Sequence, residues 1–382
     1  MKFENVTKEK LLQKLSEFKI ETPSWGFERG GTRFETYETS KDRKTIEDRI
    51  EGATRVHELT GKGERVSVHF PWDGENREEV EGLRELLQDN DLKAGSVNAN
   101  LFSMRPEREL DDRLRFGSFI SPYEEVRESA IDHVFDCVQW MRILDSKNLV
   151  LWLPDGSNSP GQMSFYDMLD RTLEYTRRVC ETLEDDETLL IEYKPFEPAF
   201  YATAVPDWGT ALYISQAVGE NAKVLVDTGH HLQASNIEQI VAYLAKSGKL
   251  GGFHFNDRKY ADDDLVAGSL RPYQLFRVFC TLQEAYRRGF LGEKDLAFAL
   301  DQSTYVKDPT EAMIESIENI MKNYLKALLV DYRKLRTQRE EPDPTEADRT
   351  LRKAFEEPVK DLTREWKEKN GLPMDPIGRY RR

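Results

Sequence analysis

Short apolar runs alternate along the chain with longer stretches in which apolar residues recur every three or four positions. Short β-rich runs are typical of buried strands, and the longer period is typical of amphipathic helices. The short runs predict eight strands, at Phe18–Glu21, Val66–Phe70, Lys93–Asn98, Asn148–Leu153, Leu189–Lys194, Lys223–Asp227, Gly251–Asn256 and Ala297–Gln302. The longer stretches predict helices at Thr45–Leu59, Arg77–Leu87, Tyr123–Leu144, Phe165–Leu183, Trp208–Ala217, Ile237–Lys246, Pro272–Arg288 and Thr310–Leu329.

This strict alternation predicts an α/β fold, a (β/α)8 TIM barrel over residues 1–330. No glycine-rich phosphate loop follows any predicted strand, which disfavours a doubly wound nucleotide-binding sheet. Residues 331–382 differ, because 14 basic and 12 acidic residues make half of this segment charged. We expect a charged, helical C-terminal extension that wraps the barrel or a neighbouring subunit.

Composition and charge narrow the class of partner. The chain has 382 residues with 55 basic and 70 acidic side chains, a net charge of −15. Such a surface repels polyanions, so neither nucleic acid nor an anionic membrane is an expected partner. No apolar run approaches the roughly 20 residues of a membrane span. The first twenty residues carry charges throughout and do not resemble a signal peptide, so we expect a cytoplasmic protein.

In a barrel of this kind the active site lies where the strands end. The fifth to eighth predicted strands end in IEYKP, VDTGHH, FHFND and ALDQS. These segments place polar side chains at four consecutive strand ends, namely Glu192, Lys194, Asp227, His230, His231, His254, Asn256, Asp257 and Asp301. We therefore expect these groups to meet in the mouth of the barrel.

Four of these residues, Glu192, Asp227, His254 and Asp301, form an oxygen-rich set with a single nitrogen. Such a donor set suits Mn²⁺, Mg²⁺ or Co²⁺, and it lacks the thiolates of a cysteine-type zinc site. Any one of them can instead be a mouth carboxylate paired with a nearby Arg or Lys. All four at consecutive strand ends favour a metal site.

A second cluster follows in the sequence. His230 lies three residues beyond Asp227, and the loop after the seventh strand contains Asp262 and Asp264. Residues two apart in an extended loop point the same way, so this pair can bind one ion together. A solvated acidic turn is the alternative interpretation of the loop. We expect His231 to lie in the core, since adjacent side chains usually diverge.

Aromatic residues accompany these polar groups. His69 and Trp72 occur in VHFPW after the second strand, and Trp152 and Asp155 occur in LWLPDG after the fourth. The C–H faces of a sugar stack on aromatic rings, and its hydroxyls need polar partners. This combination favours a polyhydroxylated ligand, although Trp152 can instead be a core residue.

These same segments carry a family resemblance. SWGFERGGTRF, HFPWDG, LWLPDGSNSPGQ, IEYKPFEPAFY, VDTGHHLQASNIEQIVA, GFHFNDRKYADDDL and DQS resemble the corresponding motifs of L-rhamnose isomerases, within the wider xylose-isomerase-like barrel superfamily. The resemblance spans roughly residues 20–330. It implies a metal-dependent isomerase that interconverts L-rhamnose and L-rhamnulose, with broad activity on other aldoses. It also implies two divalent ions per subunit, manganese before cobalt or magnesium, and a homotetramer.

Carried over residue by residue, the resemblance divides the site into two ions and a substrate. The structural, substrate-holding ion would be bound by Glu192, Asp227, His254 and Asp301. The second, catalytic ion would be bound by His230, Asp262 and Asp264. Substrate-contacting positions match Lys194, His69, Trp72 and Trp152, alongside Glu192 and Asp301. Among these, His69 is a candidate for assisting the opening of the sugar ring.

The stretch from Pro23 to Lys44 is longer than an ordinary βα loop of roughly 2–6 residues. It carries Phe34 among polar residues, after the flexible pair Gly30 and Gly31. In the resembling isomerases the corresponding loop reaches over a neighbouring subunit's active site. We therefore expect Phe34 to line the substrate site of an adjacent subunit, with packing on its own barrel as the alternative.

Two other functions compete with sugar isomerisation. A metal-dependent hydrolase or endonuclease-type enzyme can use the same barrel, but the net charge of −15 and the scarcity of imidazoles disfavour it. A catalytically silent sugar- or metal-binding protein would need only the first ion. The presence of His230, Asp262 and Asp264 argues against it.

Overall fold

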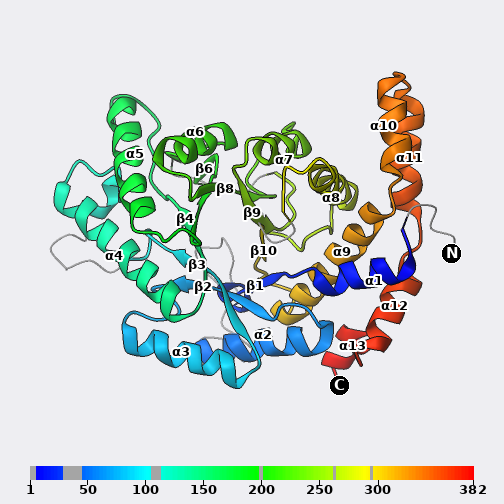
Figure 1. Cartoon of the computed structure of the whole chain (residues 1–382). Coiled ribbons are helices and arrows are strands. Elements are labelled where there is room, and N and C mark those ends of the chain that lie inside the picture. Colours follow the sequence, from blue (N-terminus) through cyan, green and yellow to red (C-terminus); the bar gives the residue numbers. More distant parts are fainter. Residues whose placement is uncertain (1–5, 29–44, 105–112, 198–200, 261–263, 293–295) are drawn as a thin grey trace.

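The computed structural model describes residues 6–28, 45–104, 113–197, 201–260, 264–292 and 296–382. Eight parallel strands close into a barrel in the order β1-β10-β9-β8-β5-β4-β3-β2 (Figure 1). Their bounds are β1 Glu21–Pro23, β2 Arg65–Phe70, β3 Lys93–Ala99, β4 Asn148–Trp152, β5 Thr188–Glu192, β8 Ala222–Asp227, β9 Leu250–Phe255 and β10 Ala297–Leu300. The predicted TIM barrel is thus confirmed. A short antiparallel hairpin of β6 (Phe196–Glu197) and β7 (Tyr201–Ala202) lies outside the barrel.

Helices surround the barrel, as the alternating pattern predicts (Figure 1). Their bounds are α2 Ile46–Thr60, α3 Arg77–Asp89, α4 Glu124–Ile143, α5 Phe165–Glu181, α6 Trp208–Val218, α7 Ile237–Lys246, α8 Pro272–Arg287 and α9 Pro309–Leu328. Each bound differs from the predicted one by no more than two residues. No helix in these described segments is both long and apolar enough to cross a membrane.

Side chains of each strand point alternately into and out of the barrel, and this alternation positions the site. Val150, Leu190 and Leu225 form a buried apolar layer inside the closed sheet. Side chains two residues apart on a strand point to the same face, so the next inward positions are Trp152, Glu192 and Asp227. The polar residues at the strand ends therefore lie next to this apolar layer, which separates them from the other end of the barrel.

The N-terminal segment departs from the prediction. A helix that the pattern did not predict, α1 (Lys8–Glu17), precedes the barrel and ends at Phe18, and β1 begins only at Glu21. The Phe18 ring stacks on Tyr324 of α9 at 4.5 Å between centroids, so its apolar character serves helix packing and not the sheet. The buried Lys62 ammonium donates to the Phe18 carbonyl at 2.8 Å and thereby caps the C-terminal end of α1.

The C-terminal extension is helical, as predicted, with α10 (Tyr332–Glu340), α11 (Pro344–Glu356), α12 (Lys360–Lys369) and α13 (Pro376–Tyr380). In Figure 1, α10 and α11 project beside α8 and α9, whereas α12 and α13 lie at the lower right, next to α1 and α2. The Trp366 indole N–H donates to Ser16 Oγ at 2.9 Å, and Arg381 pairs with Glu311 at 2.6 Å. These two contacts join the extension to α1, before the barrel, and to α9, the helix that follows the last strand.

Candidate active site

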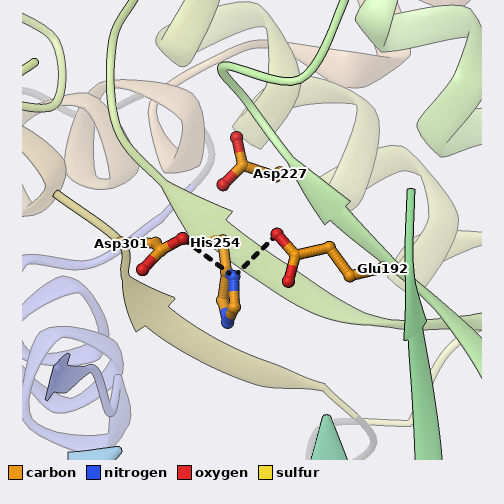
Figure 2. A group of neighbouring side chains, drawn as sticks. All are labelled: Glu192, Asp227, His254 and Asp301. Carbon is orange, nitrogen blue, oxygen red and sulfur yellow. Dashed lines mark hydrogen bonds and ion pairs between the residues drawn. The ribbon is translucent and has the colours of Figure 1, made fainter. Parts of the chain in front are cut away.

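Four side chains from four neighbouring strands converge at the mouth of the barrel (Figure 2). Glu192 ends β5, Asp227 ends β8, His254 lies in β9 and Asp301 follows β10. One ligand atom from each lies within 4.8 Å of the others, and the first three residues are buried. The structure therefore brings together all four residues that were predicted for the first ion site.

The imidazole of His254 lies between two carboxylates in this cluster. Its Nδ1 is 3.2 Å from Glu192 Oε1 and 3.4 Å from Asp301 Oδ2. Burial alone would lower the pKa of His254, but Glu192 and Asp301 together raise it well above its usual value. Since ionised carboxylates only accept, Nδ1 carries the proton. The cluster thus favours positive charge at the point where its ligand atoms meet.

The pKa values of the two buried carboxylates, Glu192 and Asp227, shift in opposite directions. Burial alone would raise the pKa of Glu192, but the charge of His254 and hydrogen bonds from His230 and His254 hold it below its usual range. Burial raises the pKa of Asp227 to about 6, against the opposing effect of His230. Three crowded acids with a single imidazole form a hard donor set, which fits a divalent cation such as Mn²⁺ or Mg²⁺.

His230 joins this cluster from the turn after β8. Its Nδ1 is 3.1 Å from the Tyr193 carbonyl and 3.3 Å from Glu192 Oε1. A carbonyl can only accept, so Nδ1 of His230 carries a hydrogen. Metal-ligating histidines commonly have one ring nitrogen held by a neighbouring oxygen in this way. His230, predicted for the second ion, thus lies beside Glu192 of the first cluster.

The other two members of the predicted second site are only partly described. Asp264 is buried, has a backbone φ of 46°, and directly precedes Leu265, which bridges to Asp257 beyond β9. This bridge holds Asp264 at the base of the loop that follows β9. Asp262 lies outside the described residues, as does Phe34.

His231 and Asp155 have structural roles. His231 is buried as expected, and its Nε2 lies 2.7 Å from the Tyr193 hydroxyl. Asp155, which we expected among the groups of the mouth, instead accepts from the backbone N–H groups of Ser118 and Ile120 at 2.6 and 3.0 Å. Its carboxylate is fully used in fastening that segment to the end of β4, so this expectation was wrong.

A row of rings forms one wall of the mouth. Trp72 stacks near His69 at 6.0 Å between centroids, and Phe102 meets both Trp72 and Trp152 edge to face at 5.4 and 5.1 Å. The Lys194 ammonium lies 4.9 Å above the Trp152 ring. Phe102 is 50% exposed and Trp72 is 39% exposed, so this wall presents apolar surface at the mouth. Sequence reasoning missed Phe102, because a lone Phe in NANLFSM carries no distinctive signal.

A polar network holds the loop that carries His69 and Trp72. The Asp73 carboxylate accepts from the His69 backbone N–H at 2.7 Å and from the Ser24 hydroxyl at 2.5 Å. Arg49 of α2 pairs with Asp73 at 3.1 Å and donates to the Trp72 carbonyl at 3.0 Å. Ser24 Oγ also lies 3.3 Å from His69 Nδ1. Burial lowers the pKa of His69 to about 3, so its ring is neutral at neutral pH.

Two further polar side chains lie at the mouth, and one of them contacts the cluster. Trp25, in the segment after β1, donates its indole N–H to Asp301 Oδ1 at 3.1 Å. Lys194 pairs with Glu197 at 3.0 Å, which fixes its ammonium at the edge of the mouth. Trp25 lies in the segment SWGF, and only the closed barrel brings residue 25 beside residue 301.

Comparison with known proteins agrees with this geometry. Residues 54–319 match the model of the family described as xylose isomerase-like TIM barrel. A probable sugar isomerase of Rhizobium meliloti is 39% identical over 368 residues, which covers 96% of this chain and 84% of that protein. A probable sugar isomerase of Mesorhizobium japonicum matches with the same identity and coverage.

Solved structures share the fold at low sequence identity. A xylose isomerase domain protein from Alicyclobacillus acidocaldarius aligns with a TM-score of 0.55 and 16% identity, over 81% of this chain and 99% of that one. An L-ribulose 3-epimerase aligns with a TM-score of 0.55 and 13% identity, over 82% of this chain and 98% of that one. At such identities the likeness concerns the fold alone.

Proposed function

The chain belongs to the xylose isomerase-like TIM barrel family, and from that premise we propose that it is a divalent-cation-dependent aldose–ketose isomerase. Its proposed substrate pair is L-rhamnose and L-rhamnulose, with activity on other aldoses. The observation that carries the proposal is the buried cluster of Glu192, Asp227, His254 and Asp301 at the mouth of the barrel. The neighbouring aromatic wall supports a sugar as the ligand.

The reaction moves one hydrogen from C2 to C1 of the sugar and one proton from O2 to O1. Bound in this cluster, a divalent cation would act as a Lewis acid that stabilises negative charge on the sugar oxygens. The chain itself contributes an oriented ammonium, because Lys194 is held by Glu197 at 3.0 Å. We assign Lys194 the role of donating a hydrogen bond to a carbonyl or hydroxyl oxygen of the open-chain sugar.

His69 is assigned to ring opening. Its ring is neutral, and its backbone and side chain are both held by the network of Ser24 and Asp73. A neutral imidazole can accept the proton of the anomeric hydroxyl, which a charged one cannot. The rings of Trp72, Phe102 and Trp152 would contact the C–H face of the sugar and keep water from that side.

The second ion is proposed from His230, Asp262 and Asp264. Support comes from the position of His230, whose Nδ1 lies 3.1 Å from the Tyr193 carbonyl and 3.3 Å from Glu192 Oε1, beside the first cluster. Manganese is the proposed ion at both positions, with Co²⁺ or Mg²⁺ as alternatives. We propose a homotetramer in which Phe34 reaches an adjacent site. Phe34→Ala should then raise KM and change the ranking of aldoses, whereas a fully active monomer in sedimentation would contradict this.

A panel of aldoses tests the function directly. The protein is stripped with a chelator, reloaded with Mn²⁺, Co²⁺ or Mg²⁺, and assayed for ketose formation from L-rhamnose, L-lyxose, L-mannose, D-allose and D-ribose. We expect metal-dependent ketose formation that is highest for L-rhamnose. Conversion of a ketose into another ketose would indicate an epimerase. Hydrolysis of a phosphodiester without any sugar isomerisation would support the hydrolase alternative.

A further inference from the structure

Asn256 directly follows β9, two residues beyond His254, and is 5% exposed. Its side-chain Nδ2 is 3.0 Å from both carboxylate oxygens of Asp227 and 3.0 Å from the backbone carbonyl oxygen of Asp301. Asp227 belongs to β8 and Asp301 follows β10, the two strands that flank β9 in the barrel. A single amide therefore joins the two ligand-bearing strands on either side of it.

The hydrogens of this amide are all accounted for. An amide nitrogen carries two, of which one is shared by the two oxygens of Asp227 and the other goes to the carbonyl of Asp301. The reverse orientation would place the amide oxygen against three oxygens, so the amide has one stable orientation. Gly229 makes room for it, because a Cβ at position 229 would lie 2.5 Å from Asn256 Oδ1.

The hydrogen bonds at Asp227 distinguish its two oxygens. Oδ1 accepts from the backbone N–H groups of Gly229 at 2.6 Å and His230 at 3.1 Å, besides Asn256. A carboxylate oxygen offers about two lone-pair directions, so Oδ1 is saturated by the protein. Oδ2, with the shared contact to Asn256 as its one hydrogen bond from the described residues, is the oxygen left for a cation.

We propose that Asn256 is a positioning residue that holds Asp227 as a one-oxygen ligand and thereby sets which cations the site prefers. The inference rests on the cation of the proposed function. Mg²⁺ and Mn²⁺ suit compact octahedral sites, whereas Ca²⁺ takes more oxygens at longer distances and often binds both oxygens of a carboxylate. A clamped Asp227 therefore favours the smaller ions, and a released Asp227 can turn both oxygens toward a larger one.

The test compares Mn²⁺ and Ca²⁺ binding without any assay of activity. Asn256→Leu removes the amide while nearly keeping its volume, and Asn256→Ala is a second variant in case leucine disturbs the fold. The matched control is Asn98→Leu, because the buried Asn98 amide donates to Ser67 and Val68 on β2. Mn²⁺ affinity is measured by the EPR signal of free Mn²⁺, and Ca²⁺ affinity by calorimetry.

We expect the Asn256 variants to bind Mn²⁺ about 10-fold to 100-fold more weakly, the range typical for removing an outer partner of a metal ligand. The Ca²⁺ affinity of these variants should fall much less or should rise, so their preference for Mn²⁺ over Ca²⁺ should drop. The Asn98→Leu control should keep the wild-type preference. Equal loss of both ions, or a Mn²⁺ affinity like that of the wild type, would overturn the positioning role. A wild-type chain that binds neither ion would overturn the cation site itself, and with it the proposed function.

Discussion

The substitution Glu192→Gln tests whether the cluster at the mouth is a cation site. Glu192 Oε1 lies 3.2 Å from His254 Nδ1 and 3.3 Å from His230 Nδ1, so this carboxylate stands between the two proposed ion sites. Glutamine preserves the shape of the side chain but removes its charge. We therefore expect the variant to keep the barrel and to lose most of its affinity for a divalent cation.

The expected change in Tm follows from the fact that a cation bound only to the folded chain stabilises it. A cation present at 100 times its Kd stabilises the folded chain by about 2.7 kcal/mol. For 382 residues the unfolding entropy is about 0.8 kcal/mol per kelvin, so the wild-type Tm should rise by about 3 °C. If Glu192→Gln weakens binding about 100-fold, the same Mn²⁺ concentration stabilises by only about 0.4 kcal/mol, a rise of about 0.5 °C.

Scanning calorimetry with Mn²⁺ and with a chelator measures this difference. The matched control is Glu187→Gln, the same substitution just before β5, at the opposite end of that strand from Glu192, where Glu187 pairs with Arg142 at 2.8 Å. The control should lower the Tm of the metal-free chain but keep the full Mn²⁺-dependent rise. A Glu192→Gln variant that gains as much from Mn²⁺ as the wild type would refute the site.

Three further predictions follow from the same geometry. The pKa of His254 is raised well above its usual value and that of Asp227 is about 6, so Mn²⁺ binding should release a proton from His254 at neutral pH and should weaken further as the pH falls through 6. Calorimetry in buffers of different ionisation enthalpy measures the released protons, and binding independent of pH would contradict this prediction. His230→Asn should abolish ketose formation while the first ion stays bound, as metal analysis would show; two retained ions with a normal rate would exclude the second site. Phe102→Ala should raise KM for aldoses several-fold with a smaller change in kcat, whereas an unchanged KM would remove Phe102 from the sugar wall.

The barrel and the four-residue cluster at its mouth could be predicted from the sequence because both rest on local signals. Strand and helix periods are repeated eight times, and strand ends are known to meet at one face of such a barrel. Glu192, Asp227, His254 and Asp301 could therefore be grouped before their distances were known, and the structure places their ligand atoms within 4.8 Å.

The supporting residues could not be found in the same way. Trp25 and Asp301, or Ser24 and Asp73, are far apart in sequence and meet only because β1 closes the barrel between β2 and β10. Asp155 shows the opposite error, since its carboxylate looked available in the sequence but is used by backbone N–H groups of a distant loop. Hydrogen bonds of this kind depend on tertiary closure, which periodicity does not encode.

The central claim is that the chain moves a carbonyl from C1 to C2 of an aldose with the help of a bound cation. The most direct test incubates L-rhamnose labelled with ¹³C at C1 with the Mn²⁺-loaded protein and follows the label by NMR. We predict that the signal of the labelled C1 changes from that of an anomeric carbon to that of a hydroxymethyl carbon. A chelator should stop this conversion, and added Mn²⁺ should restore it. A label that stays anomeric in the loaded protein, or a conversion that the chelator leaves unchanged, would contradict the account.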